Sequence, residues 1–305
     1  MHDGSPDGGP GRAPPGRGAA RAYAGVCHGT LGELFQGPLR YEGVRHIALV
    51  SFPVARHAWA YFVPDGDAAL GALPAGEKSA RAVRLLLERH GRALPPGRWH
   101  AHSELDVGVG MASSTADIVA SLRCASRVLG LPLDRRAVQE ILAGIERADS
   151  VFLDEFAVYL SARHRVVRGL GPGPALHAAF VTEPGTVDTG AVTPLLLPHY
   201  ERRHAEYDRT LTDLVKGFTA GDARAVARAA TASAALSQEV LPKAAFDEVL
   251  AHREGFGADG VFVAHTGSLL GYLFSAPPPP ALKGELSAFF RSLGHQCSFA
   301  RGGCP

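Results

Sequence analysis

Apolar positions recur along the chain with two different periods, which predict a mixture of helices and strands. The clearest helix is predicted from Ser113 to Leu129, where Ile118, Leu122 and Ala125 form one apolar stripe at spacings of three and four. Further helices are predicted over residues 78–90, 135–145, 201–219, 222–236, 243–253 and 282–293. Asp134 stands where a residue that caps the second of these helices is expected.

Short apolar, aromatic-rich runs predict the strands. A short strand over Val26–Thr30 is expected to lead into a turn-like segment that ends at Gly37, and Pro53 is expected to separate two further strands. Strands are predicted over residues 46–54, 57–63, 99–105, 163–167, 176–182, 260–265, a short run to 274, and an edge strand over 297–299. The order of elements predicts an α+β fold in two parts, joined by a linker near residues 170–176.

Composition narrows the class of protein. Residues 1–22 hold almost no large apolar side chain, which predicts a disordered tail. The net charge of +1 gives no reason to expect nucleic acid as a partner, and no apolar run is long enough to cross a membrane. The four cysteines lack metal-like spacing, and no signal peptide is visible, so we expect a cytoplasmic monomer or homodimer.

A glycine-rich stretch, Val107–Asp117, lies between a predicted strand and the predicted 113–129 helix. Backbone amides at a helix N-terminus lack intrahelical partners, and glycines allow a phosphate to approach the backbone closely. Hydroxyl groups there can donate to phosphate oxygens or bind Mg²⁺. The candidate phosphate-binding residues are Gly108, Gly110, Met111, Ala112, Ser113, Ser114 and Thr115.

The commoner nucleotide loops do not fit this stretch. A Walker A motif requires a lysine, and the chain has none between Lys78 and Lys216. No HRD or DFG motif follows, and the third glycine of a Rossmann fingerprint is missing. From the loop alone, a serine-capped helix without a ligand remains an alternative.

Four segments, in order, resemble motifs of the GHMP kinase superfamily. Gly108-Val-Gly-Met-Ala-Ser-Ser-Thr-Ala-Asp117 resembles its central motif, in wording closest to the L-threonine kinases of cobalamin biosynthesis. Gly32-Glu-Leu-Phe-Gln-Gly37, Ser51-Phe-Pro-Val54 and Gly260-Val-Phe-Val-Ala-His-Thr-Gly-Ser-Leu-Leu-Gly271 resemble the accompanying motifs, so the resemblance spans residues 23–275. Cys27–Thr30 and the segment 38–46 depart from the family pattern, in the region where these enzymes bind the phosphate acceptor.

The resemblance implies a two-domain GHMP kinase fold. Residues 23–172 would form a ribosomal-protein-S5-domain-2-like ATP-binding part, and residues 173–305 a ferredoxin-like part. It implies ATP and Mg²⁺ as cofactors, Asp149 as the catalytic base, and Ser114 and Glu146 as metal ligands. The residues implied at the acceptor are His28, Thr30, Glu33, Gln36, His265, Thr266 and Gly267.

The expected function is phosphorylation of the side-chain hydroxyl of L-threonine, or a related hydroxy amino acid, to O-phospho-L-threonine. That product would serve cobalamin side-chain synthesis or a specialised metabolite. Two alternatives remain. One is a kinase for another acceptor, such as serine, homoserine or a natural-product alcohol. The other is a non-catalytic sensor that binds a nucleotide or metabolite.

Overall fold

The computed structural model describes residues 22–185 and 189–304 of the 305-residue chain, so the predicted tail lies almost entirely outside the described residues. The described strands are β1 (Tyr23–Tyr41), β2 (Val44–Pro64), β3 (Gly97–Ser103), β4 (Phe156–Leu160), β5 (Arg165–Gly171), β6 (Leu176–Thr182), β7 (Gly260–Val263), β8 (Leu269–Phe274) and β9 (Ser298–Gly302). The helices are α1 (Glu77–His90), α2 (Ser113–Leu129), α3 (Arg135–Ala143), α4 (Thr189–Arg202), α5 (His204–Ala220), α6 (Ala223–Ser237), α7 (Phe246–His252) and α8 (Pro280–Ser292). The expected α+β class is confirmed.

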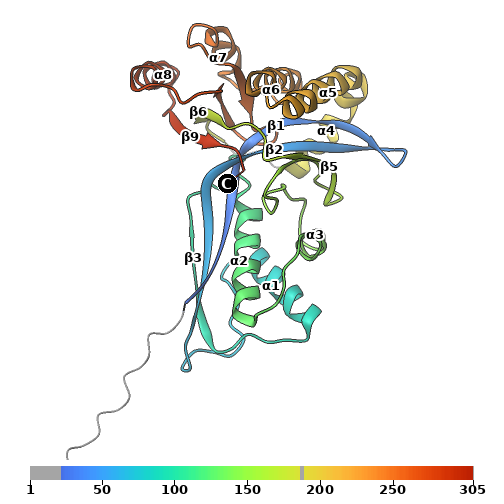
Figure 1. Ribbon diagram of the computed structural model, residues 1–305, viewed down its shortest axis with the longest axis vertical. Helices are drawn as coiled ribbons and strands as arrows, with labels where there is room; N and C mark the ends of the chain where they lie inside the picture. Colours follow the sequence, from blue (N-terminus) through green and yellow to red (C-terminus); the bar gives the residue numbers. More distant parts are fainter. Residues whose placement is uncertain (1–21, 186–188, 305) are drawn as a thin grey trace, which may run out of the picture.

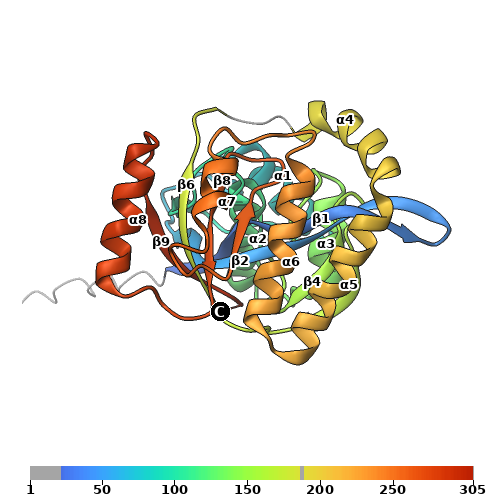
Figure 2. The same ribbon diagram turned by 90° about the horizontal axis from the view of Figure 1, so that it is seen from above.

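The described strands form one antiparallel sheet, in the order β1-β7-β8-β6-β9-β2-β4-β5, with β3 paired to β2. Strands β1 and β2 are long and form a hairpin. Figure 1 shows this hairpin running from the lower part of the molecule, beside α1 and α2, into the upper part. Helices α4 to α8 lie over the upper part (Figure 2), while α1, α2 and α3 lie beside the lower part. Both parts therefore share the same two strands.

The first two strands differ from the sequence prediction. The expected turn-like segment up to Gly37 belongs to the single strand β1, and the two strands expected around Pro53 are the single strand β2. The ladder is irregular between His28 and Phe35, and Gly32 has a left-handed φ of 60°. Bulges interrupt the regular pairing, so they tolerate glycines and a proline that has no N–H to donate. A polar, glycine-rich sequence can therefore continue as a strand.

Helix α2 packs closely on β1 because a glycine faces it. A Cβ atom built on Gly25 would lie 2.0 Å from the carbonyl oxygen of Ala120 and 2.4 Å from the amide nitrogen of Cys124. Any side chain at this position would push the helix away. The apolar stripe predicted for α2 is buried, with Ile118 and Leu122 fully enclosed. The boundaries predicted for α2 are confirmed.

Three other parts of the prediction need correction. Strand β4 was missed because all five of its side chains are buried, so it shows no alternation. Helix α4 was missed because Pro194 and Pro198, which normally end helices, lie within it. Strand β9 is not an edge strand, since it pairs with β6 on one side and with β2 at Val54 on the other.

Within residues 22–185 and 189–304, no helix is long and apolar enough to cross a membrane. All four cysteines are free thiols. The expected division near residues 170–176 falls between the end of β5 and the start of β6.

Candidate active site

The glycine-rich loop is held from two sides by its carbonyl oxygens. Met111 O accepts from the Thr30 amide at 3.1 Å, Gly110 O from the Gly32 amide at 2.9 Å, and Val109 O from the Ser268 amide at 2.9 Å. In a trans peptide the C=O and the following N–H point in opposite directions. The amides that follow Met111 O and Gly110 O therefore face away from β1, and the amide that follows Val109 O faces away from the 264–268 loop.

The N-terminus of α2 adds to this set of donors. No side chain caps α2, and its N-cap residue Ala112 has a left-handed φ of 55°. By contrast, α3 and α6 are capped by Asp134 and Asp222, which accept from the amides three residues on. Uncapped amides and the helix dipole together form a site for an anion. The arrangement agrees with the predicted phosphate-binding role, which stays a prediction, and the segment 108–115 is called the phosphate loop below.

A glycine is required at position 110, where the phosphate loop passes the 264–268 loop. Its φ is 104°, and a Cβ there would lie 2.4 Å from Cβ of Ala264. We expect Gly110→Ala to lower the free energy of unfolding by roughly 1–3 kcal/mol and to weaken nucleotide binding, because strain and overlap displace the loop. Denaturant unfolding and nucleotide titration measure the two effects.

Gly130→Ala is the matched control for that substitution. Gly130 also has a positive φ, 64°, but a Cβ there meets nothing within 4 Å. It should show the backbone strain without the overlap, and leave nucleotide binding unchanged. Equal losses of nucleotide binding in the two variants would contradict the claim that close packing of Gly110 against Ala264 positions the loop.

Glu146 faces the start of α2. Its Oε2 accepts from the Ser114 hydroxyl at 3.2 Å and its Oε1 from the Thr115 hydroxyl at 3.4 Å. Lys78, on α1, forms a salt bridge with Glu146 and donates to the Ser114 hydroxyl at 3.3 Å. One cation, one carboxylate and two hydroxyls therefore meet beside the uncapped amides.

This group of atoms fits Mg²⁺ of the kind that phosphates help to bind. Mg²⁺ prefers oxygen donors, and it commonly takes one or two protein ligands together with substrate phosphates. Ser114 Oγ and Glu146 Oε2 are such donors and already lie within hydrogen-bond distance of each other. No cluster of three or more His, Cys, Asp or Glu side chains suited to a metal occurs in the described part of the chain, so an all-protein metal cage is not found there.

Asp149 is a partly buried residue in the segment between α3 and β4. Its one hydrogen bond in the described structure comes from the Ser51 hydroxyl, 3.4 Å from Oδ1, and Ser150 in turn donates to Ser51 at 3.3 Å. Burial, and then the negative charges of Glu33 and Glu146, raise the pKa of Asp149 to about 7. A carboxyl group with such a pKa exchanges protons near neutral pH, as a general base does.

Glu33 and Gln36 belong to β1, and both are buried instead of lying on the expected turn. Glu33 Oε2 accepts from the backbone amide of His265 at 2.9 Å and lies 3.2 Å from its Nδ1. Ser233 Oγ lies 2.9 Å from Nε2 of the same ring and accepts from the Gln36 amide at 3.2 Å. Ser233 is completely buried, so this arrangement joins β1, α6 and the 264–268 loop and offers no exposed nucleophile.

The remaining predicted residues take separate places. The Thr30 hydroxyl donates to Gly110 O at 3.3 Å, and Gly267 packs against the loop, since a Cβ on it would lie 2.3 Å from Val109 O. Both support the phosphate loop. Thr266 is partly buried and directly precedes Gly267 in the sequence. Both ring nitrogens of His28 lie near backbone carbonyls, of Gly29 at 3.0 Å and of Leu153 at 3.3 Å, so this ring ties β1 to the segment after Asp149.

Several residues at the site were not identified from the sequence. Lys78 lies far from the loop in sequence and reaches it only because α1 packs beside α2. Tyr200, whose hydroxyl accepts from Gln36 Nε2 at 3.1 Å, lies on the helix that the prediction missed. Ser51 was not named as a site residue, although it begins the motif Ser51–Val54. That motif is the signal that could have identified it.

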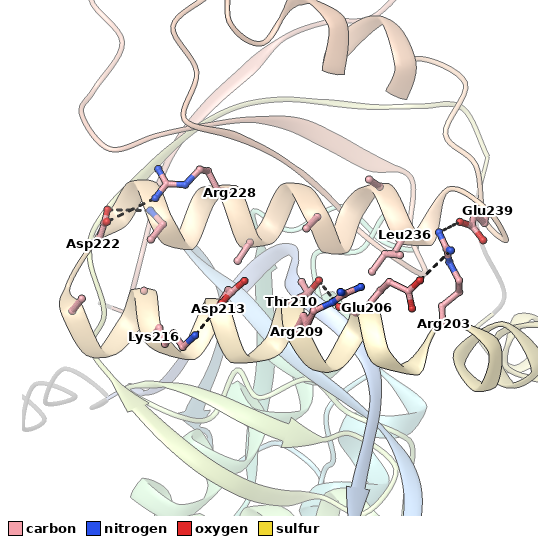
Figure 3. Close-up of a pocket in the computed structure, with 16 residues that line it drawn as sticks. Arg203, Glu206, Arg209, Thr210, Asp213, Lys216, Asp222, Arg228, Leu236 and Glu239 are labelled. Atoms are coloured by element: carbon pink, nitrogen blue, oxygen red, sulfur yellow. Dashed lines mark hydrogen bonds and ion pairs between the residues drawn. The ribbon is translucent and has the colours of Figure 1, made fainter.

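A groove of about 970 Å³ lies elsewhere, between α5 and α6. Figure 3 shows its charged side chains turned toward one another, with Arg203 paired to Glu239 at 2.6 Å and Lys216 to Asp213 at 3.4 Å. None of the phosphate-loop residues lines it. Because all of its labelled charges except Arg209 already have ion-pair partners, it is a weaker candidate for a ligand site than the loop.

Residues 77–162 match the family model described as the GHMP kinases N terminal domain. This range contains α1, the phosphate loop, α2, Glu146 and Asp149. The family match and the geometry described above therefore select the same part of the chain.

Two curated relatives and one solved structure extend the comparison. The chain is 30% identical over 183 residues to an L-threonine kinase of Citrobacter freundii, a match of 58% of this chain and 62% of that protein, so it spans less than two thirds of the relative. It is 26% identical over 260 residues to an L-threonine kinase of Salmonella typhimurium, 81% of each. The crystal structure of a homoserine kinase from Cytophaga hutchinsonii superposes with a TM-score of 0.67 at 14% identity, over 94% of this chain and 97% of that one. At that identity the likeness concerns the fold, and it confirms the expected one.

Proposed function

We propose that this chain is an ATP-dependent kinase for the side-chain hydroxyl of a small hydroxy amino acid, with L-threonine as the first choice. The match of residues 77–162 to the GHMP kinases N terminal domain and the similarity to L-threonine kinases support this proposal. The observation that carries the proposal is the position of Asp149. This carboxyl group, with a pKa of about 7, lies within electrostatic reach of Glu146, which contacts the phosphate loop, and of Glu33 on β1. A candidate phosphate site and a candidate base thus share one region.

The donor side of the site would hold the triphosphate of ATP. The uncapped amides of α2 and the amides turned away from β1 would donate to phosphate oxygens. Ser114 and Glu146 would hold Mg²⁺, which offsets phosphate charge when bound. Lys78 would move from Glu146 to the phosphates, because Mg²⁺ takes over the neutralisation of that carboxylate.

The acceptor side would present a hydroxyl group to Asp149. The hydroxyl oxygen forms a bond to the γ-phosphorus as the bond to the leaving ADP oxygen breaks, and its proton passes to Asp149. Phosphoryl transfer depends mostly on positioning and on charge stabilisation. Asp149 is suited to both tasks, since it is ionised above pH 7 and its neighbours Ser51 and Ser150 restrict its orientation.

L-threonine is proposed first because both reported curated relatives are L-threonine kinases. The product would then be O-phospho-L-threonine, which would serve cobalamin side-chain synthesis or a specialised metabolite. A related acceptor is the second candidate, because Cys27–Thr30 and residues 38–46 depart from the family pattern.

An acceptor panel tests this proposal. The full chain with ATP and Mg²⁺ is given L-threonine, L-serine or L-homoserine, and the rate of ADP release is measured above a control without acceptor. We expect kcat/KM to be highest for L-threonine. A clear preference for another amino acid would replace threonine by that acceptor. ATP binding without turnover of any acceptor would contradict the proposed kinase activity and favour a non-catalytic sensor that binds a nucleotide.

A further inference from the structure

Lys243 is a buried cation for which the proposed reaction has so far no use. It lies in the segment between α6 and α7 and is only 8% exposed. Its backbone is fixed, since the Lys243 amide donates to Gln238 Oε1 at 2.7 Å and its carbonyl accepts from the Phe246 amide at 3.2 Å. Its ammonium group has no hydrogen bond or ion pair with any other residue in 22–185 or 189–304. An ammonium group with so little solvent contact and no protein partner is poorly compensated, which favours an anionic ligand beside it.

The surroundings of Lys243 place it on the acceptor side. Burial lowers the pKa of Lys243, while the carboxylates of Glu183 and Glu33 act in the opposite direction, so both lie within electrostatic reach. Glu183 is already occupied, because it accepts from the amides of Ala244 and Ala245 at 3.2 and 2.8 Å. Glu33 is the residue that also acts on Asp149. Lys243 and Asp149 therefore lie around the same carboxylate.

Glu33 has one oxygen left for a ligand. Its Oε2 is engaged by His265, whereas its Oε1 has no hydrogen-bond partner within the described ranges. The site thus presents an unpaired ammonium at Lys243 and a free carboxylate oxygen at Glu33. An amino acid carries the complementary pair, an α-carboxylate and an α-ammonium, a few ångströms from its hydroxyl.

We propose that Lys243 binds the α-carboxylate of the acceptor, while Glu33 Oε1 accepts from its α-ammonium and the side-chain hydroxyl lies at Asp149. This assignment rests on the proposed function and narrows its substrate class to zwitterionic amino acids, excluding simple alcohols. The phosphates of ATP are a less suitable anion for Lys243. The phosphate loop has Lys78 beside it, and the carboxylates that act on Lys243 belong to β1 and to the segment after β6.

The test compares L-threonine with L-threoninamide, which keeps the hydroxyl and the ammonium but has a neutral amide in place of the carboxylate. We expect Lys243→Met to raise the KM for L-threonine about 10- to 100-fold, the loss typical of a hydrogen bond to a charged group. The kcat/KM for L-threoninamide should be nearly equal in the two proteins, and the KM for ATP should not change. Lys243→Arg, which keeps the charge, should restore part of the affinity for L-threonine.

Lys216→Met is the matched control, because Lys216 is an exposed lysine on α5 with a side chain 73% accessible. It should behave as wild type with both acceptors. An unchanged KM for L-threonine in Lys243→Met would overturn the assignment while the kinase itself stands. Equal losses with both acceptors would overturn it in favour of a structural role. If Lys243→Met does not fold, the wild type decides: failure to prefer L-threonine over L-threoninamide contradicts the assignment. Absence of turnover with any amino acid would instead remove the proposed function.

Discussion

Asp149→Asn is expected to lower kcat by about 10²- to 10⁴-fold, the contribution typical of a positioned general base. The KM for ATP should stay near its wild-type value, because Asp149 does not contact the phosphate loop. Burial, Glu33 and Glu146 raise the pKa of Asp149 to about 7, and the basic form is the ionised one. Wild-type kcat should therefore rise with pH through about 7, and this rise should disappear in the variant.

The matched control for this substitution is Asp154→Asn. Asp154 lies five positions along the same segment but is exposed, so its loss should leave the pH profile unchanged. A variant Asp149→Asn with wild-type kcat would contradict the role of base. If kcat fell while the pH dependence persisted, Asp149 would orient the acceptor, and another group would titrate.

The same substitution should also change stability in a pH-dependent way. The pKa of Asp149 is higher in the folded than in the unfolded protein, so its ionisation destabilises the fold increasingly as pH rises from about 4 through about 7. Asp149→Asn should therefore gain free energy of unfolding relative to wild type over that range, by roughly 2 kcal/mol. Denaturant unfolding at pH 5 and pH 8 measures the difference.

The second large effect is expected at Glu146. Glu146→Gln should weaken the activation of the enzyme by Mg²⁺ at least about 10- to 100-fold, which is the loss typical even of the outer contacts of a metal site. In the proposed site, the charge of Glu146 would hold Mg²⁺ together with Ser114, and in the structure it pairs with Lys78. Rates measured across a Mg²⁺ titration at saturating L-threonine give the result.

Glu140→Gln is the control for Glu146→Gln. Glu140 is a carboxylate on α3 that pairs with Arg89 and Arg136 on the protein surface, away from the phosphate loop. It should leave the Mg²⁺ dependence unchanged. An unaltered Mg²⁺ titration in Glu146→Gln would show that Glu146 is not a metal ligand and only holds Lys78 and the hydroxyls in place.

Local sequence was enough to predict the glycine-rich loop and the helix that follows it. Helix α2 has a full apolar stripe, the glycines precede it directly, and its first residues carry hydroxyls, so strand, loop and helix could be assigned from neighbours in sequence. The loop and the helix N-terminus together needed no information from distant parts of the chain. Only the supports of the loop, from β1 and the 264–268 loop, required the structure.

The acceptor side was harder to predict, because it is assembled from distant segments. Glu33 was expected on a turn, but the bulges of β1 keep it in a strand whose polar residues are buried against α6 and the 264–268 loop. Lys243 had no local signal, since a lysine between two helices normally faces solvent. Its role depends on burial and on a carboxylate more than two hundred positions away, which no local pattern reveals.

Transfer of the γ-phosphoryl group of ATP to the hydroxyl of an amino acid is the reaction proposed for this site. Phosphorus NMR of the full chain with ATP, Mg²⁺ and L-threonine tests it most directly. We predict ADP and a new phosphomonoester in equal amounts, formed only when all three are present and greatly slowed in Asp149→Asn. ADP with inorganic phosphate alone, or no change in the ATP resonances, would contradict the account.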